Sequence, residues 1–219
     1  MRIERLKAAI VQVAESLLPD VPLDQQLSPS EQIQVHAFVV ISHSAIEEYI
    51  EQLLTDSLDE ALNKGLAPGG PLPLIALPLA VHHSAEIIGQ SSGKGAFITA
   101  RSVHQKLLGL YTSKVVKPNN GIKRKDIEKL CKPLGIDVAG FDGDLEVAVT
   151  ALDTLGAKRG TLAHTLSVAA REVIRPEQAR EWVNDSIDGI EALTQHIEES
   201  VARTVHQTED TLKAGEVEN

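Results

Sequence analysis

The chain has 219 residues, 42% of them apolar, and a net charge of -10. This apolar share is ordinary for a globular core, and the negative charge argues against indiscriminate binding of nucleic acid over the whole surface. A single cysteine, Cys131, excludes an internal disulfide and a cysteine zinc cluster, and favours a reducing cytoplasm as the compartment.

Apolar residues at helical spacing predict two helices in the first part of the chain. The first covers residues 2–18, has no signal-peptide core, and ends where Pro19 follows. The second covers residues 28–63 and opens with a proline in its first turn. The expected apolar stripe of this second helix is Ile33, Ala37, Val40, Ile41, Ala45, Tyr49, Leu53 and Leu54.

The middle of the chain alternates apolar segments with glycine and proline. Residues 74–88 predict a buried helix and residues 89–95 a loop. Residues 98–116 predict another helix, followed by a turn over 117–121. No stretch reaches the roughly 18 apolar residues that span a bilayer, so we expect no membrane association.

The last part of the chain predicts three further helices. A short amphipathic helix covers residues 122–134, an apolar stripe of helical spacing covers 145–155, and a long helix begins at Pro176. The acidic segment 208–219 reads as a frayed tail. Because no strand pattern and no repeat appear, we predict an all-α fold, a single helical bundle over residues 1–207.

Positive charge is concentrated in one segment. Residues 94–132 hold ten Lys and Arg and two acidic residues. The rest of the chain holds eleven Lys and Arg and twenty-nine acidic residues. Such a segment is either a solvated face that pairs with acidic helices or an electrostatic footprint for a polyanion. The second interpretation makes these residues the candidate contacts: Lys117, Asn120, Lys123, Arg124 and Lys125.

One six-residue run pairs a permanent cation with an imidazole, Arg159-Gly160-Thr161-Leu162-Ala163-His164. An arginine grips phosphate with a planar fork of donors, and a histidine moves protons near neutral pH. Together they suffice to cut RNA without a metal. Taken alone the run is a weak signal, because an arginine at a solvated helix end and a packed histidine fit it too.

Three segments of the chain resemble one family. They are the helix over residues 36–51, the turn and helix over 119–136, and the apolar helix over 152–164 that ends in the Arg–His run. In order and spacing they are similar to the HEPN superfamily of helical domains, found in prokaryotic toxins and antiviral ribonucleases, and most closely to its RiboL-PSP-HEPN branch. The resemblance covers about residues 32–201 and implies a HEPN-type bundle with long second and last helices.

The resemblance implies an activity and a site. HEPN ribonucleases are homodimers in which two Arg–His pairs meet in one cleft, which makes Arg159 and His164 the expected catalytic residues and Glu47 a supporting one. The implied reaction is RNA cleavage by attack of the ribose 2′-hydroxyl, with no metal and no cofactor. An antitoxin or a defence-system protein is the expected partner besides RNA.

One position departs from the family pattern. The residue after the signature arginine is usually polar, and here it is Gly160. Three hypotheses therefore stay open. The chain is a toxin-like or antiviral endoribonuclease, or it is a non-catalytic HEPN module with a decayed site that binds RNA or a protein, or it is a purely structural helical adaptor.

Other chemistry-bearing residues have structural interpretations. His36, His43 and Glu47 share a helical face, where a metal site is conceivable but packed histidines are far commoner. Cys131 is expected to be buried, and Trp182 to anchor the last helix rather than to stack on a base.

Overall fold

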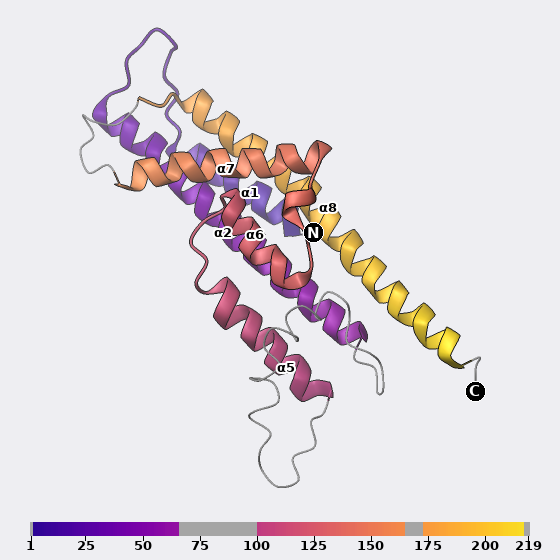
Figure 1. The fold of residues 1–219 in the computed structure, drawn as a ribbon. Helices are drawn as coiled ribbons and strands as arrows, with labels where there is room; N and C mark the ends of the chain where they lie inside the picture. Colours follow the sequence, from indigo (N-terminus) through magenta and orange to yellow (C-terminus); the bar gives the residue numbers. More distant parts are fainter. Residues whose placement is uncertain (1, 66–99, 165–172, 217–219) are drawn as a thin grey trace. The chain divides into compact units, whose positions relative to one another are not determined.

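The computed structural model describes residues 2–65, 100–164 and 173–216, and the side chains of residues 3–63, 103–162 and 173–200. In this part of the chain the structure holds helices and no strand (Figure 1), which confirms the all-α prediction. The helices are α1 (Arg2–Leu17), α2 (Pro29–Gly65), α5 (Ala100–Tyr111), α6 (Arg124–Cys131), α7 (Gly143–His164) and α8 (Pro176–Glu216).

The start of α2 is fixed by a reciprocal capping box. The backbone N–H of Ser28 donates to Oε2 of Glu31 (2.7 Å), and the N–H of Glu31 donates to Oγ of Ser28 (3.3 Å). The two hydrogen bonds satisfy backbone donors that the helix itself cannot pair. The long second helix therefore begins where the sequence predicts it.

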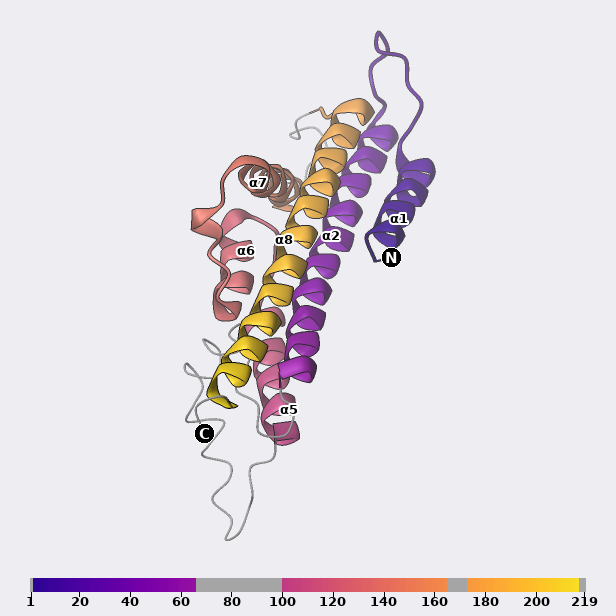
Figure 2. The same ribbon diagram turned by 90° about the vertical axis from the view of Figure 1, so that its right-hand side faces the viewer.

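The chain divides into two compact units, of which the first comprises residues 1–50, 121–127 and 141–193. In this unit α1 lies antiparallel beside the first half of α2 (Figures 1 and 2). The Arg175 guanidinium closes the intervening loop by donating to the carbonyls of Pro22 (2.9 Å) and Gln25 (2.8 Å). Lys7 of α1 pairs with Glu191 of α8 at 2.7 Å.

Helices α7 and α8 of the first unit cross at very short range. A Cβ built on Gly189 would lie 2.8 Å from Cα and 3.1 Å from the carbonyl oxygen of Ala148. The Ser186 hydroxyl donates to the Trp182 carbonyl of its own helix (2.8 Å), and its Oγ lies 3.4 Å from the carbonyl of Ala151 across this crossing. The crossing therefore depends on a residue without a side chain at position 189.

The second unit comprises residues 51–120, 128–140 and 194–219. The buried Tyr111 hydroxyl donates to the Leu130 carbonyl (2.9 Å), which joins α5 to the end of α6. Asn119 donates to the Glu51 carboxylate (2.9 Å) and so fixes the turn after α5. Cys131 is fully buried here, as expected, and burial raises the pKa of its thiol to about 12.

Most predicted helices are confirmed within a few residues. The helix predicted over 98–116 is α5 extended by a wider π-helical turn, Thr112–Val116, and the one predicted over 122–134 ends at Gly135, whose φ is 73°. Helix α8 continues to Glu216, into the segment read as a frayed tail. The predictions for 74–88 and 89–95 lie outside the described residues, and the single domain over 1–207 stays a prediction.

The predicted apolar stripe of α2 is partly wrong. Ile33 and Ile41 are 51% and 45% exposed. The buried positions of this half are Val35, His36, Phe38, Val39, Ser42, His43, Ile46 and Ile50. Apolar residues surround most of this helix, so their spacing alone does not determine which face is buried.

Candidate active site

Arg159 lies on α7, five residues before the helix ends at His164. Its side chain is half-buried, and its Nε is buried without a hydrogen-bond partner. No carboxylate in the described part of the chain forms an ion pair with it. Because a partly buried charge without a counterion is unfavourable, the guanidinium is suited to an anionic ligand.

His164 is the last residue of α7, about 7.5 Å along the helix axis from Arg159. Its side chain lies outside those that the structure describes. The pairing of Arg159 with His164 thus stays a prediction from the sequence.

His43 of α2 is close enough to Arg159 to sense its charge. The imidazole is 1% exposed, its Nδ1 has no hydrogen-bond partner, and Oε2 of Glu47 lies 3.8 Å from this atom. Burial and the positive charge of Arg159 lower the pKa of His43 to about 4, while Asp126 acts in the opposite direction. The imidazole is therefore neutral at pH 7. Helical spacing along the sequence could not reveal that the charge of Arg159 acts on His43.

The buried His43 predicts a specific loss of stability in acid. An unfolded imidazole titrates near 6.5, so its proton is taken up by the unfolded chain before the folded one. The stabilisation that comes from keeping this imidazole neutral is complete above pH 6.5 and is lost as the pH falls towards 4. The free energy of unfolding then decreases by about 3 kcal/mol in total. We expect His43→Gln to lose most of this dependence in urea unfolding at pH 7 and pH 4.5. An equal pH dependence in both proteins would contradict the buried, neutral imidazole.

The residues predicted to contact RNA fall into both units. Lys117 and Asn120 are exposed residues of the second unit. In the first unit Lys125 is exposed, whereas the Arg124 guanidinium pairs with Glu146 and its backbone N–H donates to Asp153 (3.1 Å).

Lys123 is the predicted RNA contact whose ammonium lies beside the part of α7 that carries Arg159. A Cβ built on Gly160 would lie 3.9 Å from the Lys123 Nζ. The ammonium is therefore beside the residue that directly follows Arg159.

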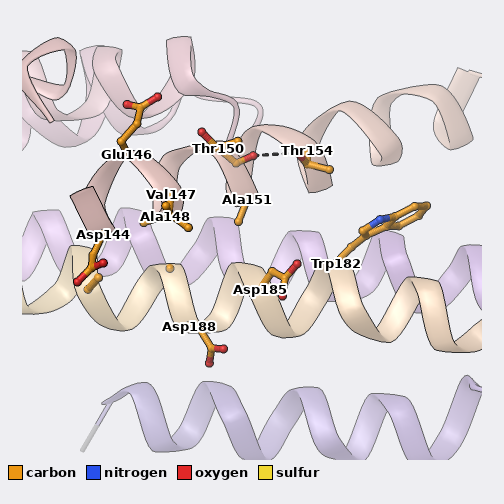
Figure 3. Close-up of a pocket in the computed structure, with 12 residues that line it drawn as sticks. Asp144, Glu146, Val147, Ala148, Thr150, Ala151, Thr154, Trp182, Asp185 and Asp188 are labelled. Carbon is orange, nitrogen blue, oxygen red and sulfur yellow. Dashed lines mark hydrogen bonds between the residues drawn. The ribbon is translucent and has the colours of Figure 1, made fainter. Parts of the chain in front are cut away.

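A groove of about 650 Å³ lies between α7 and α8 of the first unit (Figure 3). Its floor is made of small residues, and Trp182 closes one end. Its lining includes four carboxylates, Asp144, Glu146, Asp185 and Asp188, of which Glu146 pairs with Arg124. Because carboxylates repel phosphate, the groove is not suited to RNA. The Trp182 ring is half-buried and has the ammonium of Lys158 over it, 4.7 Å from the ring centre.

Two further findings concern metal and membrane. Among the residues that the structure describes, no three His, Cys, Asp or Glu side chains come together as a metal site would require. None of the described helices has the length and apolar character needed to cross a membrane.

An all-α domain with an Arg–His run at the end of a long helix is typical of the HEPN superfamily, and the comparison with known families agrees. The model of the RiboL-PSP-HEPN family matches residues 11–199, so the chain belongs to this family. Searches of curated proteins and of solved structures return no match.

Proposed function

We propose that this protein is a metal-independent endoribonuclease of the toxin or antiviral-defence type. The observation that carries the proposal is Arg159, a half-buried guanidinium with no carboxylate paired to it among the described residues, in a RiboL-PSP-HEPN domain. The same helix ends at His164, whose imidazole is the proposed general base.

The proposed reaction needs only these two side chains and the substrate. His164 takes the proton of a ribose 2′-hydroxyl, and the oxygen forms a bond to the adjacent phosphorus. The bond from phosphorus to the 5′-oxygen breaks, and this oxygen receives a proton from His164 of the partner subunit or from water. Arg159 stabilises the charge of the phosphorane. The products are a 2′,3′-cyclic phosphate and a 5′-hydroxyl.

The proposed active form is a homodimer. A two-fold axis would bring both Arg159–His164 pairs into one cleft and provide a base and an acid for the same phosphate. An antitoxin or a defence-system protein would control the activity, since a free cytoplasmic ribonuclease is harmful to its own cell.

A binding module is the alternative. Gly160 favours it, because the family's polar residue is missing there. In that case the basic residues would hold RNA or an acidic protein without cutting it.

Labelled single-stranded RNA in EDTA separates the two functions. Cleavage supports the nuclease, whereas retention of intact RNA that weakens steeply with salt supports the module. A result with neither cleavage nor retention would contradict the nuclease and the RNA-binding form of the module.

A further inference from the structure

Gly156 of α7 makes room for the side chain of Lys123, and Gly160 lies beside its ammonium. Gly156 and Gly160 are four residues apart and so lie on one face of the helix. A Cβ on Gly156 would lie 2.9 Å from the Lys123 Cγ, and one on Gly160 would lie 3.9 Å from its Nζ. The lysine stem therefore lies along the bare backbone of α7, with its ammonium beside Gly160.

The backbone around Lys123 is held in this position by its neighbours. The N–H of Lys123 donates to Oδ2 of Asp126 (3.2 Å), and the N–H of Arg124 donates to Oδ1 of Asp153 on α7 (3.1 Å). Ile122 is buried, and its Cγ1 would lie 3.5 Å from a Cβ on Gly156. The segment before α6 is thus fixed to α7, and the direction of Lys123 follows from it.

Two half-buried cations, Lys123 and Arg159, lie at this position, and neither forms an ion pair with a carboxylate in the described ranges. The nearby Asp126 carboxylate accepts a hydrogen bond from the backbone N–H of Lys123 and not from its ammonium. The buried imidazole of His43, near Arg159, is neutral and supplies no negative charge. Two cations without a direct ion-pair partner in the described ranges, one on α7 and one beside the next residue of α7, suit a ligand with several negative charges, such as adjacent phosphates.

We propose that Lys123 is a second phosphate-binding residue of the Arg159 site, and that Gly156 lets its stem lie along α7 so that its ammonium is placed beside Gly160. The ligand class is the RNA backbone, and the inference rests on the proposed function. Gly160 is then not a sign of decay. The lysine takes over the phosphate contact that the missing polar side chain would have made.

Binding tests the inference independently of cleavage. The probe is a labelled 2′-O-methyl RNA oligonucleotide, which lacks the nucleophile, followed by fluorescence anisotropy. We expect Lys123→Met to raise Kd about tenfold and to reduce the salt slope by about one, while Lys123→Arg stays near the parent. Arg180→Met removes a positive charge from an exposed site on α8, outside the basic segment 94–132, and should change Kd less than about threefold. Equal losses for Lys123→Met and Arg180→Met would overturn the proposal.

The Gly160→Asn variant distinguishes a phosphate-binding Lys123 from a site that has decayed at Gly160. An asparagine there restores the family's polar residue, its Cβ fits 3.9 Å from the Lys123 Nζ, and its amide would compete with the ammonium for the phosphate. We expect it to weaken binding as much as Lys123→Met does, with little further loss in the double variant. Tighter binding or higher activity of Gly160→Asn would overturn the proposal. Thermal unfolding of each variant checks that the fold is retained.

The outcomes also separate this inference from the nuclease. Binding that depends on Lys123 without cleavage by the parent supports the inference and contradicts the nuclease. Cleavage by the parent and by Lys123→Met at equal kcat/KM supports the nuclease and overturns the inference. A parent that does not bind the oligonucleotide overturns the inference.

Discussion

Arg159→Ala is expected to lower kcat/KM for RNA cleavage by about 10² to 10³-fold. Removing one preorganised donor to a developing oxyanion typically costs about 3–4 kcal/mol of transition-state stabilisation. The half-buried guanidinium has no ion-pair partner among the described residues, so its loss breaks no salt bridge there. The expected loss is therefore in catalysis more than in stability. His164→Ala should lower the rate by a comparable factor, because it removes the proposed base.

Single-turnover cleavage of a labelled RNA in EDTA measures these effects. Arg180→Ala is the matched control, since it removes the same charge from an exposed position on α8. It should leave kcat/KM within about threefold of the parent. Activity of Arg159→Ala equal to that of Arg180→Ala would show that the chemistry takes place elsewhere.

Gly189→Val is expected to have the largest effect on stability. The new Cβ would lie 2.8 Å from Cα and 3.1 Å from the carbonyl oxygen of Ala148. Backbone atoms of a packed helix cannot rotate away as the end of a flexible side chain can. Helices α7 and α8 must therefore separate, and we expect the free energy of unfolding to fall by about 3 kcal/mol.

Chemical denaturation of the variant and the parent tests this expectation. Gly109→Ala is the control, because it also adds a Cβ to a helical glycine but finds no atom within 4 Å. It should be neutral or stabilising by up to about 1 kcal/mol. A Gly189→Val protein as stable as Gly109→Ala would contradict the close crossing of α7 and α8.

The helices were predictable because their ends carry local signals. Ser28 and Glu31 form the capping box at the start of α2, and Gly135 adopts the left-handed conformation that closes the segment after α6. The buried face of α2 was not predictable, since Ile33 and Ile41 differ from the buried residues only in their tertiary surroundings.

The candidate site was predictable only where it depends on a motif. The Arg159–His164 run is local, and it also marks the family resemblance that the family model bears out. The position of His43 near Arg159 depends on how α2 meets α7, and no spacing along either helix encodes it. The same holds for Lys123 and Gly160, which are far apart in sequence and meet only in the folded unit.

The chemistry of the RNA ends tests the central claim most directly. Cleavage products formed in EDTA are analysed by mass spectrometry, which locates the cut site in the RNA. The same RNA is then synthesised with a single 2′-deoxyribose before the scissile phosphate. The account predicts 2′,3′-cyclic phosphate and 5′-hydroxyl ends, and no cleavage of the 2′-deoxy substrate. Ends with a 3′-hydroxyl and a 5′-phosphate, or equal cleavage of the 2′-deoxy substrate, would contradict it.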